Sequence, residues 1–214
     1  MPIRKIPKNY RNVTGRTSSQ KSEGESAFES TLERDFYTLL EFDNSVIRYE
    51  VQPVKIRYLI NGKERSYTPD ALVEYVDSTS LKPTIYEVKY RSDLKENWPE
   101  FKPKFKAAIR HARLMGWRFR LITEQEVRTT YLTNVKFLQS FRKHPVNDGY
   151  EALLLNRLAE MGETDAATLL LAVFRDKWLQ AELIPSLWRL VGVGSIGADL
   201  NTQLTMASKL WSKM

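Results

Sequence analysis

The sequence contains no cysteine and only two histidines, His111 and His144. Without cysteine the chain has no disulfide bond, no zinc site built on thiolates and no cysteine nucleophile, which suits a reducing compartment. Two histidines are also too few for a His-rich metal site or for a nuclease motif that uses several imidazoles. A catalytic centre in this chain must therefore be built from other side chains.

The sequence also lacks long apolar runs. No segment is long enough to span a bilayer, and the N-terminus has no apolar core of the kind found in signal peptides. There is no internal repeat and no glycine-rich phosphate loop, because Gly192-Val-Gly194 is not followed by the pattern that a nucleotide-binding fold needs. These absences argue against a membrane protein, an ATPase and a dinucleotide-dependent enzyme, and we expect a soluble, cytoplasmic protein.

Positive charge is in excess. The 33 lysine and arginine residues outnumber the 26 aspartate and glutamate residues, which gives a net charge of +7 and a pI of about 9.5. The excess favours a polyanionic partner, although simple solubility explains a balance of this size as well. With 214 residues and 42% hydrophobic content, the chain can form one sizeable domain or a medium domain and a small one.

Residues 1–25 have the composition of a flexible basic tail. Glycine, serine, threonine and asparagine separate the charges, and such a segment buries too little apolar surface to order itself. Its basic residues are Arg4, Lys5, Lys8, Arg11, Arg16 and Lys21. The tail either follows a DNA backbone, with Arg4, Lys5, Lys8 and Arg11 as phosphate contacts, or is merely solvated.

The first helix is predicted to begin at Ser26, because Ser26-Ala-Phe-Glu29 fits a capping box. Its buried stripe consists of apolar residues at helical spacing, namely Phe28, Leu32, Phe36, Leu39 and Leu40. Glu33 and Glu29 both border this stripe, and periodicity does not choose which of them turns toward the sheet edge. An ordinary surface glutamate is the alternative for either residue.

Antiparallel strands are predicted next, in segments rich in β-branched and aromatic residues. Asn61-Gly62 predicts a two-residue hairpin turn, and Gln52-Pro53 a bulge or kink. The predicted strands are Ile47–Val51, Val54–Ile60, a return through Ser66 into Tyr67–Val76, and Thr84–Tyr90.

Acidic residues and a lysine come together in the last two of these strands. Side chains alternate along a strand, so Glu87 and Lys89 share a face about 6.5–7 Å apart, and Asp70 lies beside them if the strands form a hairpin. Two carboxylates suit Mg²⁺, which prefers hard oxygen ligands, and a neighbouring ammonium can orient water or offset charge on a phosphate. The pattern indicates phosphodiester hydrolysis. The alternative is an exposed Glu-x-Lys pair with Asp70 as a turn residue.

A basic helix is predicted from about Pro103 to Met115, after a loop that contains Asp93, Asn97 and Trp98-Pro99. One face carries Lys102, Lys106, Arg110 and Arg113, which either grip DNA phosphates or form a solvated face. A strand at Trp117–Thr123 and a helix that reaches about Arg142 complete a mixed α/β layer sandwich.

His144–Gly149 is a credible domain boundary, which gives a nuclease-like domain at 26–145 and a small C-terminal domain at 146–214. The second domain is predicted to contain helices at Tyr150–Met161, Thr164–Leu179 and Ala181–Val191, followed by a hairpin around Asn201-Thr202. Three helices and a terminal hairpin match a winged-helix module. A purely helical appendage is the alternative.

The motifs together resemble the TnsA endonuclease subunit of heteromeric transposases, in the restriction-endonuclease-like superfamily with its Pro-Asp…(Asp/Glu)-x-Lys signature. The resemblance covers residues 26–142 well and the C-terminal helices more loosely. It is carried by Glu29-Ser-x-Leu-Glu-Arg-Asp-Phe36, Leu39-Leu-Glu-Phe-Asp43, Gln52-Pro53, Tyr67-Thr-Pro-Asp70 and Glu87-Val-Lys89.

The resemblance implies that Glu33, Asp70 and Glu87 bind Mg²⁺, with Mn²⁺ as a substitute, and that Lys89 is the catalytic lysine. Glu87 stands at a position that can be glutamine in TnsA proteins. The family subunit nicks the 5′ ends of the element in double-stranded DNA, while a TnsB transposase processes the 3′ ends. A TnsC ATPase docks on the C-terminal region. A bacterial cytoplasmic location follows from the same resemblance.

Two other functions remain open. One is a stand-alone restriction or repair nuclease of the same superfamily, which would cut plain duplex DNA with Mg²⁺ and no partner. The other is a non-catalytic DNA-binding adaptor, whose function would survive the loss of Asp70 and Lys89.

Overall fold

The structure is a computed structural model, and it describes residues 15–17, 21–22 and 26–213. The chain packs into two compact units, residues 1–127 and 128–214. We predicted the boundary at His144–Gly149, but the packing changes after Val127. The reason is that helix α4 (Thr130–Arg142) packs against α7 (Lys177–Val193) and so belongs to the second unit.

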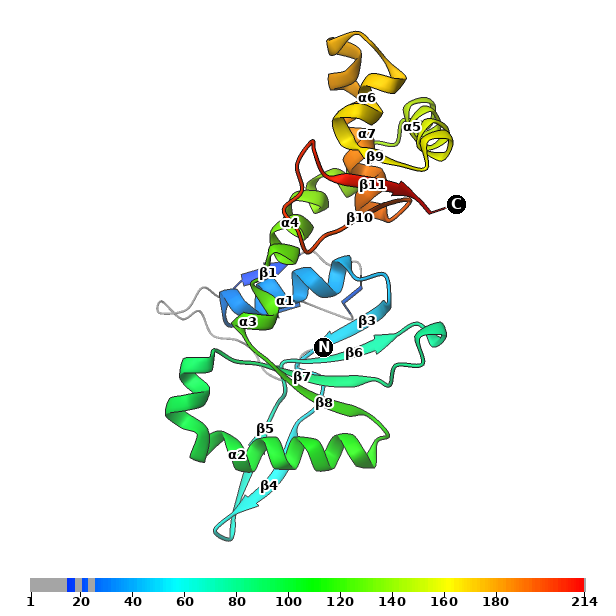
Figure 1. The fold of residues 1–214 in the computed structure, drawn as a ribbon. Coiled ribbons are helices and arrows are strands. Elements are labelled where there is room, and N and C mark those ends of the chain that lie inside the picture. The colour runs from blue at the N-terminus through cyan, green and yellow to red at the C-terminus, as the bar shows by residue number, and fades with distance from the viewer. Residues whose placement is uncertain (1–14, 18–20, 23–25, 214) are drawn as a thin grey trace. The chain divides into compact units, whose positions relative to one another are not determined.

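A four-stranded sheet forms the centre of the first unit, in the order β3–β6–β7–β8 (Figure 1). β6 pairs antiparallel with both β3 and β7, whereas β7 and β8 are parallel. The strands are β3 (Val46–Val51), β6 (Ala71–Tyr75), β7 (Thr84–Val88) and β8 (Arg118–Ile122). The predicted mixed α/β architecture is therefore confirmed.

Strand β7 is buried on both faces because helices cover both sides of the sheet. Ile85 packs with Ala112 of α2 (Arg91–Leu114), while Tyr86 contacts Phe36 of α1 (Thr31–Phe42) at a ring distance of 5.0 Å. Figure 1 shows α1 and the short α3 (Glu124–Val127) on one face and α2 on the other. Residues that alternate along β7 thus face different layers.

Helix α1 begins later than predicted. Ser26–Phe28 is strand β2, and the N-cap is Ser30, whose hydroxyl oxygen accepts a hydrogen bond from the Glu33 amide at 3.1 Å. Both Ser26-Ala-Phe-Glu29 and Ser30-Thr-Leu-Glu33 fit the capping-box spacing. The helix begins at the second capping box, because a helix that starts there buries Leu32, Phe36 and Leu40 together.

Helix α2 extends through the predicted loop. Its backbone leaves helical geometry only at Asn97 (φ −113°, ψ 19°), where two helical segments meet at a kink. Pro99 then stands in the first turn of the second segment, where proline is tolerated because its missing N–H has no partner within the helix. The segment around Asp93 is therefore helical and was wrongly assigned to a loop.

A separate two-stranded ribbon projects from the first unit and is formed by β4 (Ile56–Ile60) and β5 (Lys63–Tyr67). Asn61 (φ 50°) and Gly62 (φ 73°) form its turn, as predicted for a two-residue hairpin with both central residues at positive φ. The strand predicted over Tyr67–Val76 is interrupted by Thr68–Asp70, so the ribbon ends where the main sheet begins.

Part of the predicted flexible tail is structured. Gly15–Thr17 forms β1 and pairs antiparallel with β2, and the Lys21 amine donates to the Asp43 carbonyl at 2.5 Å. Arg4, Lys5, Lys8 and Arg11, the predicted phosphate contacts, lie outside the described residues.

The second unit combines helices with a small antiparallel sheet in the order β10–β11–β9. A continuous helix over Thr164–Leu179 was predicted, but Asp176 caps a new helix there by accepting from the amides of Trp178 and Leu179. The remaining elements are α5 (Asp148–Met161), β9 (Glu163–Asp165), α6 (Ala166–Val173), β10 (Ile196–Ala198) and β11 (Lys209–Ser212).

A buried amide joins two ends of this second unit. The Asn134 side chain of α4 donates to the carbonyls of Leu200 and Thr202 and accepts from the amide of Leu204.

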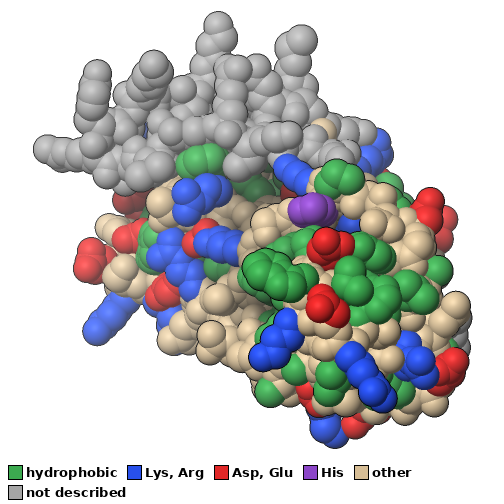
Figure 2. Space-filling view, turned by 90° about the horizontal axis from the view of Figure 1, so that it is seen from above, with side chains coloured by type: hydrophobic (Ala, Val, Ile, Leu, Met, Phe, Trp, Pro, Cys, Tyr) green, Lys and Arg blue, Asp and Glu red, His purple; other side chains and the backbone are tan. Residues whose placement is uncertain are grey.

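Some large apolar side chains stay exposed on the surface, among them that of Trp178, which is 84% exposed. Figure 2 shows hydrophobic side chains gathered beside acidic and basic ones on one face of the molecule. Within the described ranges, no helix is long and apolar enough to cross a membrane.

Candidate active site

The pairing of β6 with β7 brings the predicted site residues to one end of these strands. Ala71 is opposite Tyr86, and the Asp70 amide donates to the Tyr86 carbonyl at 3.1 Å. Asp70 therefore lies immediately before β6. Glu87, near the end of β7, and Lys89, just after β7, lie beside it. The two strands do form the antiparallel pair on which the expected placement of Asp70 beside Glu87 and Lys89 depended.

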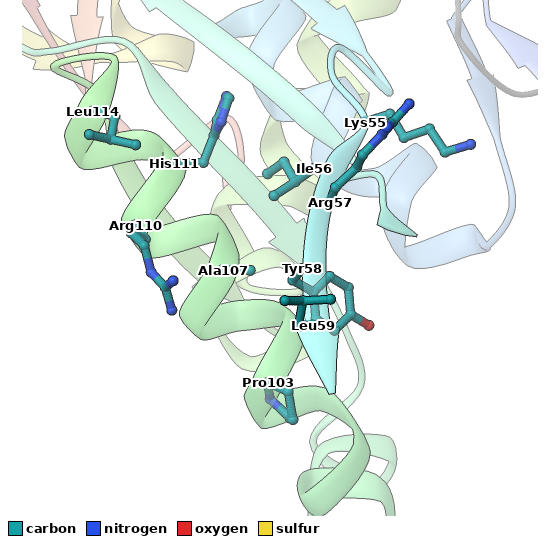
Figure 3. A pocket seen from close by; sticks show the side chains of 10 residues that line it. All are labelled: Lys55, Ile56, Arg57, Tyr58, Leu59, Pro103, Ala107, Arg110, His111 and Leu114. Carbon is teal, nitrogen blue, oxygen red and sulfur yellow. The ribbon is translucent and has the colours of Figure 1, made fainter. Parts of the chain in front are cut away.

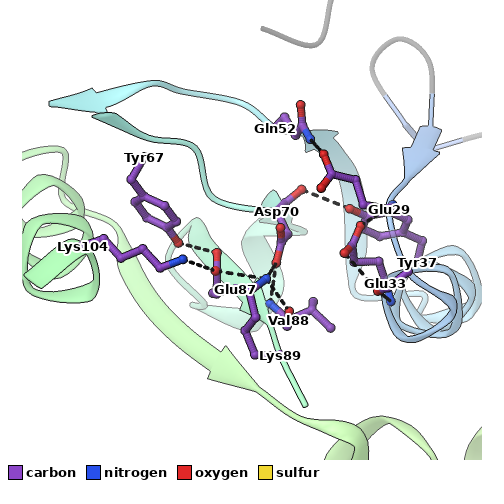
Figure 4. A network of polar contacts seen from close by, with 11 residues as sticks. Glu29, Glu33, Tyr37, Gln52, Tyr67, Asp70, Glu87, Val88, Lys89 and Lys104 are labelled. Atoms are coloured by element: carbon purple, nitrogen blue, oxygen red, sulfur yellow. Dashed lines mark hydrogen bonds and ion pairs between the residues drawn. The ribbon is translucent and has the colours of Figure 1, made fainter. Parts of the chain in front are cut away.

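The Lys89 ammonium lies between the two carboxylates (Figure 4). Its Nζ is 3.5 Å from Asp70 Oδ2 and 3.2 Å from Glu87 Oε1. Asp70 Oδ2 also accepts from the Val88 amide at 2.7 Å, which fixes the carboxylate against the strand. Three of the four predicted site residues thus converge within ion-pair distance.

Burial sets the charge state of this cluster. Burial, followed by the negative charge of Asp70, raises the pKa of Glu87 from 4.5 to about 7, although two lysines act in the opposite direction. Burial lowers the pKa of Lys89, but Asp70, Glu87 and Glu33 together raise it above its ordinary value, so the amine stays protonated. The Glu87 carboxyl is therefore poised between its neutral and its charged form near pH 7, beside a protonated Lys89.

Glu33 reaches the cluster from the first turn of α1. It is 7% exposed, and its carboxylate accepts from the Glu29 amide at 2.8 Å and from the Ser30 hydroxyl at 3.0 Å. Burial, and next the charge of Asp70, raise its pKa from 4.5 to about 7. Glu33 is therefore both a helix cap and a buried acid close to Asp70, whereas Glu29 lines the open cavity beside it.

Glu33→Gln should stabilise the metal-free protein at alkaline pH. The folded protein binds the Glu33 proton more tightly than the unfolded chain, so this stability is present at low pH and is lost as pH rises through about 7. Glutamine keeps the capping acceptor without the charge, and we expect about 2 kcal/mol of added stability at pH 8.5. The gain should shrink greatly at pH 5.5.

Chemical unfolding in EDTA at the two pH values measures this difference. Glu96→Gln, an exposed change on α2, is the matched control and should alter neither curve. A Glu33→Gln protein less stable than the parent at both pH values would mean that the charge of Glu33 holds the fold together.

Two residues of the cluster were missed from the sequence. The Tyr67 hydroxyl, at the end of β5, donates to Glu87, and Lys104 Nζ of α2 lies 3.6 Å from Glu87 Oε1. The Lys104 ammonium also lies over the Phe101 ring, 4.3 Å from its centroid. The only sequence signal was the helical spacing of Lys104 from Phe101, three residues away on the face that packs inward.

The four residues of the predicted basic face of α2 lie on another side of the helix than Lys104. All four are exposed, and none of them lines the cavity that contains the carboxylates. They are Lys102, Lys106, Arg110 and Arg113. The helix therefore presents one lysine to the acidic cluster and the other cations to its surface.

The carboxylates open into a cavity of about 550 Å³. Gln52 closes one side: its backbone is at φ 51°, its amide donates to the Asp70 carbonyl at 3.1 Å, and its side chain donates to Glu29 at 3.2 Å. Gln52, whose backbone is in the left-handed conformation, stands in the predicted Gln52-Pro53 kink. Its backbone hydrogen bond fixes the end of β3 against Asp70. The cavity is large enough to take a phosphate group and its water.

The donor set suits a hard divalent cation. Asp70 and Glu87 offer carboxylate oxygens on either side of Lys89, and Mg²⁺ commonly takes one or two carboxylates and completes its shell with water and substrate phosphate. Across the part of the chain that the structure describes, no group of three or more His, Cys, Asp or Glu side chains is arranged to hold a metal ion. Glu33 therefore fits as a neighbour of the pair rather than as a third ligand already in place.

A mixed sheet between helices, with two carboxylates and a lysine at the ends of adjacent strands, defines a domain of the restriction-endonuclease-like class. Residues 43–124 match the family described as TnsA-like endonuclease N terminal, so this part of the chain is similar to a TnsA-like endonuclease domain. The matched range includes Asp70, Glu87, Lys89 and Lys104 but not Glu33 or the second unit. A comparison with curated proteins gives no match. The resemblance inferred from the motifs is confirmed over this range.

Proposed function

We propose that the protein is a Mg²⁺-dependent DNA endonuclease subunit of a heteromeric transposase and that it cleaves the 5′ ends of the mobile element. The observation that carries the proposal is the placement of Lys89 Nζ within 3.5 Å of both Asp70 and Glu87, inside a TnsA-like endonuclease domain. Two oxygen donors and one ammonium around a cavity are what phosphodiester hydrolysis needs.

Asp70 and Glu87 would hold the metal ion, and Glu33 would share its coordination once the substrate phosphate enters. When bound, Mg²⁺ or Mn²⁺ supplies a Lewis acid that stabilises charge on the phosphate and makes water more acidic. Lys89 orients the attacking water and offsets negative charge on the phosphate, because its ammonium already faces the cavity. Tyr67 and Lys104 hold the Glu87 carboxylate in place, because the Tyr67 hydroxyl donates a hydrogen bond to it and the Lys104 ammonium lies within ion-pair distance of it.

The second unit serves partners in this proposal. Its order of two helices, a strand, two helices and two strands supports a winged-helix module, and its exposed Trp178 offers apolar surface to another protein. By family resemblance the partners are a TnsB-type transposase at the transposon ends and a TnsC-type ATPase at the C-terminal unit. Double-stranded DNA of the element ends is the substrate, and the complex works in the cytoplasm.

A reconstituted reaction tests the proposal directly. A plasmid that carries the element ends is incubated with a TnsB-type transposase, with and without the chain, and breaks are mapped on each strand. We expect 5′-strand breaks only when the chain and Mg²⁺ are both present. EDTA should remove these breaks, and Mn²⁺ should restore them.

The competing functions give different results in the same reaction. Cutting of plain duplex DNA by the chain alone would indicate a stand-alone nuclease. Unchanged 5′-strand breaks after omission of the chain would remove it from the chemistry and leave a DNA-binding adaptor.

A further inference from the structure

A second cavity lies between the ribbon strand β4 and helix α2 (Figure 3). It has a volume of about 440 Å³, and no aspartate or glutamate is among its lining residues. The catalytic cavity is different, because four acidic residues line it, namely Glu29, Asp70, Glu87 and Glu100. A hydrated divalent cation is attracted by carboxylate oxygens, so the catalytic cavity is the one of these two that suits it.

Glu29 is the acid that the start of α1 presents to the catalytic cavity. The two oxygens of Glu33, four residues later, accept hydrogen bonds from the Ser30 hydroxyl and the Glu29 amide, and Glu33 is not among the residues that line the cavity. Sequence periodicity left open which of the two glutamates turns toward the sheet edge. The structure gives them different places, with Glu33 capping the helix and Glu29 at the cavity wall.

Gln52, just after β3, holds the Glu29 carboxylate at this wall. Its side-chain amide donates to Glu29 Oε1 at 3.2 Å, while its backbone amide donates to the Asp70 carbonyl at 3.1 Å. Figure 4 shows the Gln52 amide pointing toward the Glu29 carboxylate, on the side of Asp70 that faces away from Lys104. One residue therefore ties the backbone of Asp70 and the side chain of Glu29 to the end of β3.

Two features of Gln52 are unfavourable for stability. Its backbone is left-handed (φ 51°), a conformation that residues other than glycine rarely adopt. Within the described residues its side-chain carbonyl is also buried and accepts no hydrogen bond, and Gln52 is only 7% exposed. Strained residues of this kind persist where the surrounding fold holds them, and they cluster at functional sites. The position of Gln52 beside Asp70 and Glu29 fits that pattern.

We propose that Gln52 is a positioning residue of the catalytic cavity and that it acts through Glu29, whose carboxylate accepts hydrogen bonds from the water shell of a divalent cation at Asp70 and Glu87. The inference rests on the proposed nuclease function and adds one carboxylate and its support to the site. Among the described residues no group of three or more acidic side chains is arranged to hold a metal ion, so Glu29 fits contact through water. Mg²⁺ commonly keeps several of its waters in proteins.

The test is Mg²⁺ affinity measured by titration calorimetry without DNA. Gln52→Met keeps the chain length of glutamine but removes both amide atoms, and we expect the affinity to fall about tenfold. Glu29→Gln removes the charge and should cause a loss of the same order. The double variant Gln52→Met/Glu29→Gln should lose no more than Glu29→Gln alone, because a residue that acts through Glu29 has no effect once that carboxylate is gone.

Melting curves in EDTA separate positioning from folding. Gln52→Met loses one hydrogen bond and one buried, unsatisfied carbonyl together, so it should melt close to the parent temperature. Asp70 stays anchored in this variant, because its carbonyl still accepts from the Gln52 backbone amide and from the Tyr37 hydroxyl. Gln203→Met, the same change at an exposed position of the second unit, is the matched control and should alter neither melting nor Mg²⁺ affinity.

Several results would overturn the proposal. They are a parental Mg²⁺ affinity in Gln52→Met, losses that add up in the double variant, an equal loss in Gln203→Met, and no Mg²⁺ binding by wild type. If Gln52→Met does not fold, Glu29→Gln decides the question alone, since a parental affinity in that variant removes the carboxylate through which Gln52 is proposed to act.

The reconstituted reaction distinguishes this inference from the proposed function. If wild type cuts 5′ strands but Gln52→Met keeps the parental Mg²⁺ affinity, only the role of Gln52 is wrong. If the losses of Mg²⁺ affinity are as expected and non-additive while wild type cuts no 5′ strand, the positioning role stands and the nuclease assignment fails.

Discussion

Asp70→Asn should reduce 5′-strand cleavage by about 10³-fold or more while the fold stays intact. Asparagine has nearly the shape of aspartate, and its carbonyl oxygen can still accept the Val88 amide hydrogen bond that now reaches Asp70 Oδ2 at 2.7 Å. The charge that attracts a divalent cation is lost, and Lys89 loses one of its two closest counter-charges. The rate in the reconstituted reaction and Mg²⁺ titration calorimetry measure the two effects.

Asp77→Asn is the control for this change. Asp77 is exposed in the turn that follows β6, so the substitution removes the same charge away from the cavity. The control should cleave at the parental rate, and 3′-strand cleavage by the partner transposase should persist with both variants. Normal 5′-strand cleavage by Asp70→Asn would remove Asp70 from the metal site and with it the proposed chemistry.

The strands of the ribbon and of the sheet were predictable because their signals are local. Asn61-Gly62 specifies a hairpin turn in any context, and alternation along Thr84–Val88 fixes which residues face each helix layer. The same rules placed Asp70, Glu87 and Lys89 together, since a hairpin of two adjacent strands leaves few registers that bury both. The core of the site was therefore within reach of sequence reasoning.

Helix boundaries were less predictable because several local solutions compete. Ser26 and Ser30 both start a capping-box frame, and only burial of the apolar stripe in the tertiary structure chooses between them. Pro99 suggested a loop, yet it occupies a first turn after the kink at Asn97. The unit boundary was misplaced for a similar reason, because the packing of α4 on α7 involves residues far apart in sequence.

Lys104 and Tyr67 were missed because their roles depend on long-range packing. Lys104 lies two residues from the predicted basic face of α2, and only the docking of α2 beneath the sheet brings its ammonium to Glu87. Tyr67 belongs to a quoted motif, but nothing in the motif indicates that its hydroxyl donates to a carboxylate twenty residues later. Such contacts follow from tertiary structure and not from spacing.

The acidic cluster is a place where function opposes stability. Two buried carboxylates with pKa values raised to about 7 are costly to ionise in the metal-free protein, and the lysines around them reduce that cost without removing it. A bound cation would neutralise the remaining charge. The protein should therefore gain thermal stability from Mg²⁺ through linkage, and Asp70→Asn should lose this gain.

Lys89→Met should separate catalysis from metal binding. Methionine keeps an unbranched apolar stem like that of lysine but removes the ammonium that lies 3.2 Å from Glu87 and 3.5 Å from Asp70. This ammonium repels a divalent cation that uses the same carboxylates, so the variant should bind Mg²⁺ as tightly as wild type or several-fold more tightly. Cleavage should nevertheless fall about 10²–10³-fold, because the charge that orients water and offsets the phosphate is gone.

This combination of tighter metal binding and slower cutting is specific to a catalytic ammonium. A merely structural lysine would leave the carboxylates disordered on removal, and Mg²⁺ affinity and rate would then fall together. Lys82→Met, at an exposed position outside both cavities, should change neither quantity. If Lys89→Met instead cuts at the parental rate with Mg²⁺ bound, Lys104, 3.6 Å from the same carboxylate, becomes the ammonium that the reaction uses.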